Sequence, residues 1–239
     1  EAHPANQRLA AASVRVALCV VGDRHLAHDL PLPANLFEIE PCECAPMLLG
    51  FECQRLMADR LGDFDWYVFL EDDLVIDDPF FFAKLAWFRD VAGEDTVLQA
   101  NRFEAGPGGP AHKLYLDWDV RPERSEPFHH RADRTEIRAA HLGLDLVFRR
   151  PLNPHSGFFA VSNAQLRYWV SRPWFLDRDC RFIGPGESSA TLGVLRTFRL
   201  YKPGIENAGF LELRHPGAAF RALLGGKVRV VPDRASLLE

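Results

Sequence analysis

The sequence predicts an α/β protein of one domain, with a mainly parallel sheet flanked by helices. Short apolar runs of strand length alternate along the chain with amphipathic stretches of helix length. The 239 residues, 47% of them hydrophobic and 26% charged, are enough for one large core. Strands that are connected through helices usually run parallel in one sheet. We therefore expect a single domain over residues 1–239.

The expected strands are β-branched or aromatic apolar runs that stop at Gly, Pro or acidic residues. They cover residues 14–21, 36–39, 65–70, 96–100, 144–148, 157–161 and 198–202. The expected helices carry leucines and aromatic residues at helical spacing. They cover residues 46–61, 79–91, 164–170 and 187–195. Residues 104–138 are rich in Gly, Pro, His and charge, and predict a long irregular loop, with a hairpin around residues 113–118 left open.

Composition excludes several classes of function. A net charge of −5 argues against a nucleic-acid partner, because such proteins usually present a basic face. No apolar run approaches the roughly 20 residues of a membrane span, and no signal peptide is visible. We expect a cytoplasmic protein, or one peripheral to a membrane. The chain does not begin with Met, so a fragment of a longer protein with flanking domains stays open.

Five cysteines without a CxxC pair predict free thiols in a reducing compartment, with one disulfide in an exported protein as the alternative. A thiolate zinc site is not indicated, because no second pair completes four ligands. A metal ion in this protein is therefore expected to bind oxygen ligands.

Three acids follow the expected strand at residues 65–70, namely Glu71, Asp72 and Asp73. Ligands of open α/β sheets bind at the carboxyl ends of strands. Three adjacent carboxylates repel one another, and a hard cation such as Mn²⁺ or Mg²⁺ offsets this repulsion while keeping positions open for phosphates. The alternative is a solvated acidic turn.

The segment that begins at Phe69, with the sequence Phe-Leu-Glu-Asp-Asp-Leu-Val-Ile-Asp-Asp-Pro-Phe-Phe-Phe, resembles the DxD segment of glycosyltransferases with the A-type (GT-A) fold. It is most similar to the N-acetylglucosaminyltransferase I type. The resemblance implies a Rossmann-like GT-A fold in which Asp73 binds the metal ion. It also implies that Glu71 and Asp72 contact the sugar and ribose of a nucleotide-sugar donor.

Three later segments extend this resemblance. Ser156 and Gly157 precede an aromatic strand, and glycine permits close approach of a donor. Glu187 follows Gly-Pro-Gly at a helix start, where inverting GT-A enzymes carry a catalytic base; the alternative is a plain helix cap. His215 resembles a late histidine that completes metal or diphosphate binding, with an ordinary surface histidine as the competing interpretation.

These observations together predict a metal-dependent hexosyl- or N-acetylhexosaminyltransferase, inverting if Glu187 is the base. By resemblance, the donor is a uridine-diphosphate sugar and the acceptor a glycan or other hydroxyl-bearing molecule. Lys202 and Arg214 are candidates for neutralising diphosphate oxygens. Two alternatives stay open. One is a nucleotidyltransferase that makes nucleotide sugars, disfavoured by the single Gly22 after the first strand. The other is a non-catalytic sugar- or protein-binding domain.

Overall fold

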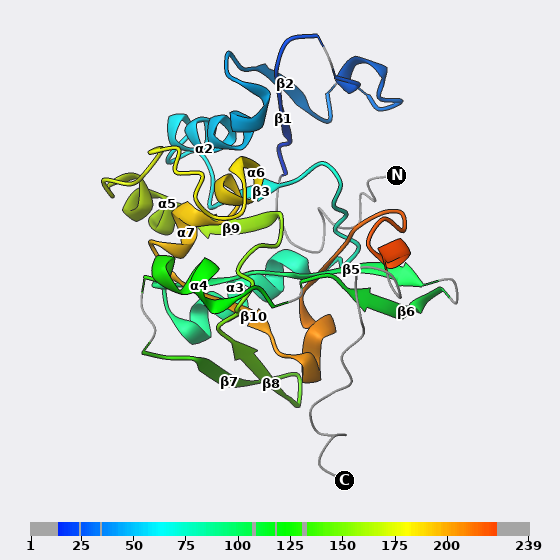
Figure 1. Ribbon diagram of the computed structural model, residues 1–239, viewed down its shortest axis with the longest axis vertical. Helices are drawn as coiled ribbons and strands as arrows, with labels where there is room; N and C mark the ends of the chain where they lie inside the picture. The colour runs from blue at the N-terminus through cyan, green and yellow to red at the C-terminus, as the bar shows by residue number, and fades with distance from the viewer. Residues whose placement is uncertain are drawn as a thin grey trace.

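A computed structural model describes residues 14–223 except residues 24, 34, 107–108, 118 and 131–132. Figure 1 shows the strands β1 (Ala17–Val20), β2 (Glu38–Pro41), β3 (Trp66–Leu70), β4 (Thr96–Leu98), β5 (Asn101–Gly106), β6 (Gly109–Tyr115), β7 (Glu136–His141), β8 (Leu144–Arg149), β9 (Phe158–Ser162), β10 (Arg199–Pro203) and β11 (Glu212–Arg214). The α-helices are α2 (Leu49–Asp59), α3 (Phe81–Ala92), α4 (Pro122–Ser125), α5 (Asn163–Val170), α6 (Pro185–Ser189) and α7 (Leu192–Leu195). Short 3-10 helices are η1 (Ala27–Asp29), η2 (Pro46–Leu48), η3 (Glu126–Phe128), η4 (Ile205–Phe210) and η5 (Arg221–Leu223).

The prediction of a mainly parallel, Rossmann-like GT-A sheet is wrong. The protein is mixed α/β, with antiparallel and mixed sheets that curl into a half-barrel. The pairs β1–β2, β4–β10 and β5–β11 are parallel, whereas β3–β9, β5–β6, β7–β8 and β8–β10 are antiparallel. The error has a physical reason: β5–β6 and β7–β8 are hairpins without a crossover helix, and β3 pairs with the distant β9. The alternation of strands and helices along this chain therefore does not determine whether neighbouring strands run parallel or antiparallel.

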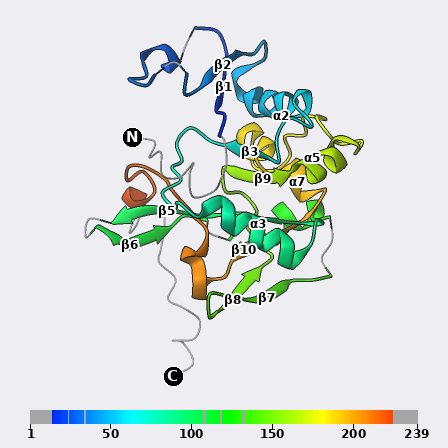
Figure 2. The same ribbon diagram turned by 180° about the vertical axis from the view of Figure 1, so that it is seen from behind.

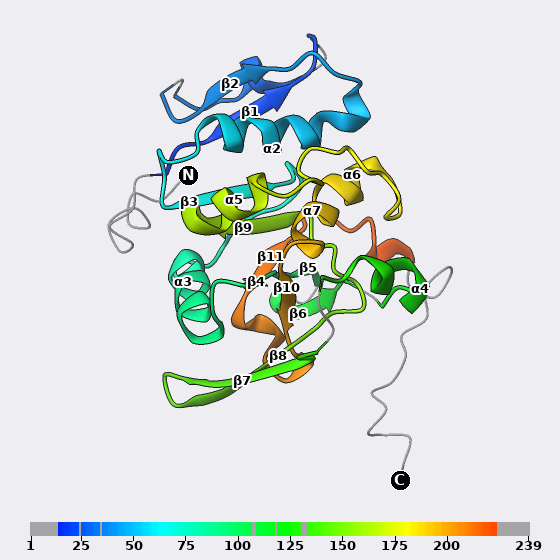
Figure 3. The same ribbon diagram turned by 90° about the vertical axis from the view of Figure 1, so that its left-hand side faces the viewer.

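Two apolar clusters lie on opposite faces of the strands β3, β9, β4 and β10. Along β9, Phe158 and Ala160 contribute to one cluster and Phe159 and Val161 to the other, as the alternation of strand side chains requires. Helix α3 covers the first face, as Figure 2 shows from behind. Helices α2, α5 and α7 cover the second (Figure 3). Burial on both faces makes these strands a rigid support for the loops that follow them.

The N-terminal strands β1 and β2 form a separate two-stranded layer, and α2 lies between them and β3–β9 (Figure 3). Gly50 lets α2 approach α6 closely, because a Cβ on Gly50 would overlap the side chain of Ser189. This contact ties the end of α6 to the N-terminal part of the chain.

The segment 104–138, expected to be an irregular loop, contains regular structure in its described residues. It holds the end of β5, strand β6, helices α4 and η3, and the start of β7. Strand β6 pairs with β5 through Phe103↔Tyr115 and Glu104↔Leu114. The Gly, Pro and charge content of this segment reflects turns and an exposed hairpin.

All five cysteines are free thiols in this structure. Among the residues that the structure describes, no helix is long and apolar enough to cross a lipid bilayer.

Candidate functional site

The acidic triplet occupies a tight turn directly after β3. The backbone N–H of Glu71 donates to the carbonyl of Gly157 (2.9 Å), and the N–H of Leu74 donates to the carbonyl of Glu71 (3.2 Å). Asp72 and Asp73 are exposed, while Glu71 is partly buried. The turn thus presents two carboxylates to solvent and holds the third against the strand ends.

The chain after this turn joins β11 through an isolated antiparallel bridge. The N–H of Val75 donates to the carbonyl of Arg214 (2.9 Å), and the N–H of Arg214 donates back (3.0 Å). The bridge brings His215 to the acidic turn, where its Nε2 lies 3.3 Å from Oδ2 of Asp73. Two residues that the sequence analysis named as metal ligands are therefore neighbours, although they come from opposite ends of the chain.

Glu104 is a third member of this group, and the sequence analysis missed it. Its side chain is fully buried on β5, and Oε1 lies 3.4 Å from Nδ1 of His215. The imidazole is thus held between the carboxylates of Glu104 and Asp73. No pattern in the sequence marks Glu104, because only the pairing of β11 with β5 brings it to His215.

The carboxyl group of Glu71 lies in an environment that disfavours its charge. Burial raises its pKa to about 7; the positive charge of Arg102 opposes this rise, and the negative charges of Asp73, Glu187 and Asp72 add to it. The charges of Asp72, Asp73 and Glu187 therefore all raise the pKa of Glu71. A bound cation would relieve this mutual repulsion.

Gly157 is fitted to its position beside Glu71. Its φ of +59° lies in the left-handed region, and a Cβ there would overlap the carboxylate of Glu71 and lie 2.9 Å from Cδ1 of Leu74. Ser156 is fully buried and its hydroxyl donates to the carbonyl of Phe158 (3.0 Å), so its side chain faces the protein. Of the two predicted donor contacts, Gly157 borders the acidic turn and Ser156 supports the loop from within.

A buried ionic network lies behind the turn. Asp117 accepts from Nε of Arg102 (2.9 Å) and from Nζ of Lys202 (2.8 Å), and these two cations hold the pKa of Asp117 below its usual range against the effect of burial. Lys202 also donates to the carbonyl of His155 (2.7 Å). Two cations share one buried anion, so the network presents a net positive charge toward Glu71.

His155 itself is not an acid or base at neutral pH. Burial, together with the charges of Arg102 and Lys202, lowers its pKa to about 3. Its Nδ1 lies 3.2 Å from the hydroxyl of Thr191, and its Nε2 lies 4.0 Å from Oε1 of Glu71. His155 therefore acts as a neutral packing group beside the acidic turn.

The two basic residues proposed for diphosphate binding have protein partners instead. Lys202 is buried in the network just described. The guanidinium of Arg214 makes two hydrogen bonds to Asp77, at 2.7 and 3.0 Å. Spacing along the sequence does not reveal either partner, because Asp117 and Asp77 are more than 80 residues away.

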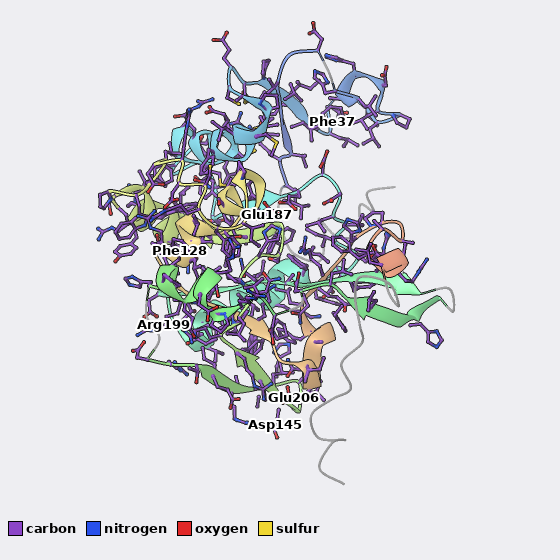
Figure 4. The ribbon with its side chains drawn as sticks, viewed as in Figure 1. Phe37, Phe128, Asp145, Glu187, Arg199 and Glu206 are labelled. Carbon is purple, nitrogen blue, oxygen red and sulfur yellow. The ribbon has the colours of Figure 1, made fainter. Side chains whose placement is uncertain are left out.

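Glu187 lies in the first turn of α6, and Figure 4 labels its side chain. It is partly buried, and no side chain caps this helix start. The effect of its charge on Glu71 shows that the two carboxylates share one electrostatic environment. The site thus combines an exposed acidic turn with a separate carboxylate on a neighbouring helix.

Within the described residues, no group of three or more His, Cys, Asp and Glu side chains is arranged to hold a metal ion by itself. Asp73 and His215 offer one carboxylate and one imidazole, and the Asp73 side chain is 56% exposed. Mg²⁺ and Mn²⁺ commonly bind through one or two protein ligands and complete their coordination with substrate phosphates and water. This donor pair fits such an ion.

No protein-family model matches this sequence, and no curated protein matches it at a significant level.

Proposed function

We propose that this protein is a metal-dependent glycosyltransferase that moves a sugar from a nucleotide-diphosphate donor, a uridine-diphosphate sugar, to an acceptor hydroxyl. The observation that carries the proposal is the approach of Asp73 to His215 at 3.3 Å, next to Glu71 and Asp72 at the end of β3. An exposed Asp73 carboxylate next to the largely buried imidazole of His215, with further acids beside them, suits a cation that also binds phosphate oxygens.

In this proposal Asp73 and His215 hold Mn²⁺ or Mg²⁺. When bound, the ion acts as a Lewis acid that offsets charge developing on the departing diphosphate. Glu71 and Asp72 contact the sugar and ribose of the donor, and Gly157 leaves the room that Glu71 requires. Asp72 is exposed and free to turn toward a ligand.

Glu187 takes the proton of the acceptor hydroxyl while the hydroxyl oxygen attacks the anomeric carbon of the donor sugar. The bond from that carbon to the diphosphate oxygen breaks at the same time. A carboxylate in the first turn of a helix is stabilised as an anion by the backbone N–H groups, which favours a base at neutral pH. A single displacement of this kind inverts the configuration of the sugar.

Calorimetry of uridine diphosphate binding, carried out once with Mn²⁺ and once with EDTA, tests the proposal. We expect binding that needs Mn²⁺ in the natural protein and is lost in Asp73→Ala. Asp90→Ala is the matched control, because Asp90 is an exposed acid on α3, 68% accessible, that pairs only with Arg89 among the described residues. Equal binding in Mn²⁺ and EDTA would contradict the metal assignment. Turnover of a nucleoside triphosphate with release of pyrophosphate would favour nucleotide-sugar synthesis, and the absence of any nucleotide binding would favour a binding domain.

A further inference from the structure

Glu104 is a buried carboxylate on β5 that hydrogen-bonds to the backbone of a segment more than 100 residues away. Its side chain has no solvent exposure. Oε1 accepts the backbone N–H of Phe220 (2.9 Å) and Oε2 accepts the backbone N–H of Arg221 (2.7 Å). These two hydrogen bonds satisfy one acceptor position on each oxygen and leave further lone pairs available. The carboxylate thus fixes the segment that leads into η5 and can still accept another donor.

The remaining neighbour of this carboxylate is the imidazole of His215. The backbone N–H of His215 donates to the carbonyl of Phe103 (2.8 Å), which seats the residue against β5. The ring of Phe220 packs edge-on against the imidazole, with the centroids 5.2 Å apart. The orientation of the imidazole is therefore restricted from the backbone, from one face and from Glu104.

The two ring nitrogens face different carboxylates. Nδ1 is buried, has no hydrogen-bond partner of good geometry among the described residues, and lies 3.4 Å from Oε1 of Glu104. Nε2 faces Asp73 at 3.3 Å, and the Asp73 side chain is open to solvent. A neutral imidazole carries one N–H, and the neighbour of one nitrogen decides which nitrogen is left with a lone pair.

We propose that Glu104 is a positioning residue that accepts the Nδ1–H of His215 and so directs the lone pair of Nε2 toward the Asp73 side. Carboxylates that hold the second nitrogen of a metal-binding histidine fix its tautomer in this way. Either tautomer leaves one ring lone pair facing a carboxylate oxygen. In the Nδ1–H tautomer that lone pair is on Nε2, where a cation held together with Asp73 would separate it from the carboxylate, whereas Nε2–H would obstruct such a cation. The inference rests on the proposed function for the identity of the ligand, but the tautomer of His215 is a property of the protein alone.

The test is the protonation of the two ring nitrogens of His215, measured by long-range ¹H–¹⁵N NMR in the metal-free protein over a range of pH. The signal is assigned by its loss in His215→Gln. We expect the Nδ1–H tautomer in the natural protein and a shift toward Nε2–H in Glu104→Gln, whose amide N–H₂ competes as a donor. Uridine diphosphate affinity in Mn²⁺ should fall by about 10–100-fold in the same variant.

Glu212→Gln is the matched control. Glu212 lies on β11, accepts from the hydroxyl of Tyr115 (3.1 Å) and pairs with Lys113, so the tautomer of His215 should not change. If Glu104→Gln does not fold, Glu104→Asp replaces it, because the shorter side chain withdraws the carboxylate from Nδ1 and the same tautomer shift is expected.

Three results would overturn the inference: the Nε2–H tautomer in the natural protein, a ring that stays protonated on both nitrogens at every pH at which the protein is folded, or an unchanged Nδ1–H tautomer in the folded Glu104 variant. Failure of the proposed function is a separate result, since it shows as absent Mn²⁺-dependent nucleotide binding in the natural protein whatever the tautomer of His215.

Discussion

Replacement of Gly157 by alanine would test whether the position of Glu71 matters for donor binding. Gly157 and Gly143 both have left-handed backbones, with φ of +59° and +78°. An L-residue in this conformation costs about 1–2 kcal/mol, so Gly157→Ala and Gly143→Ala should both lower the free energy of unfolding by that amount. For a chain of this size the loss corresponds to a fall in Tm of about 2–8 °C.

The two variants differ in what the new methyl group meets. At Gly143, in the β7–β8 turn, a Cβ has no described atom within 4 Å, whereas at Gly157 it overlaps the carboxylate of Glu71. The end of a glutamate side chain can move aside, but the new methyl group also lies 2.9 Å from Cδ1 of the buried Leu74, so Gly157→Ala should lose more stability than Gly143→Ala. The displaced carboxylate, however, no longer occupies its place next to the acidic turn. We expect Gly157→Ala to bind a uridine-diphosphate sugar at least about tenfold more weakly, equivalent to about 1.4 kcal/mol, and Gly143→Ala to bind it normally.

Urea denaturation supplies the stabilities, and calorimetry in Mn²⁺ supplies the affinities. The same measurements on Glu71→Ala and on the double variant Glu71→Ala/Gly157→Ala complete a double-mutant cycle. If the clash is the cause, Gly157→Ala should have little further effect on affinity once the Glu71 carboxylate is gone. Equal donor affinity in Gly157→Ala and Gly143→Ala would refute the reasoning.

Three further predictions concern the base, the buried network and the response to acid. Glu187→Gln keeps the size of the side chain but cannot accept a proton, so donor affinity should stay within about twofold while the rate of sugar transfer falls by about 10²–10⁴-fold. A transfer rate near that of the natural protein, or a product with retained anomeric configuration, would contradict the role of Glu187 as the base. Asp117→Asn leaves two buried cations without their anion and should lower the free energy of unfolding, measured by urea denaturation, by about 3–5 kcal/mol. A loss below about 1 kcal/mol would contradict the stabilising role of the buried ionic network. The pKa of His155 is about 3 in the folded protein and 6.5 ordinarily, so between these pH values the unfolded chain binds more protons and the free energy of unfolding falls as the pH falls. In His155→Gln, the urea midpoint should therefore decline less steeply between pH 6.5 and pH 3. An equally steep decline in the variant would exclude His155 as its source.

The positions of most helices and strands could be predicted from the sequence, because they depend on local patterns. The apolar run at residues 65–70 became β3, and the expected helix at residues 79–91 became α3. Strand directions could not be predicted. The antiparallel register of Trp66 with Ser162 joins segments about 100 residues apart, and no local pattern encodes it. Strands β5 and β7 were also missed as separate elements, since their turns are rich in Gly and charge, and β6 overlaps only in part with the hairpin left open around residues 113–118.

The candidate site divides in the same way. The acidic turn, Gly157 and His215 could be selected by residue type, and the structure brings Asp73 and His215 together. Their roles in binding a metal ion and a donor stay predictions. Glu104 could not be found from the sequence, because only the pairing of β11 with β5 places its carboxylate beside His215. The acidic partners of Lys202 and Arg214 could not be found from the sequence for the same reason, and a role of these two residues in diphosphate binding stays a prediction.

The bridge between Val75 and Arg214 also dictates when the site can form during folding. Strand β3, helix α3 and the hairpins are complete well before β11 is available, yet the acidic turn meets His215 only when β11 has inserted beside β5. Contacts between such distant segments form slowly, because a long loop must close before they stabilise anything. On the ribosome, the triplet therefore emerges long before its imidazole neighbour. A nascent or prematurely terminated chain carries the acids without the completed site, so the nucleotide binding that we propose would report that synthesis has passed His215 and that β11 has docked.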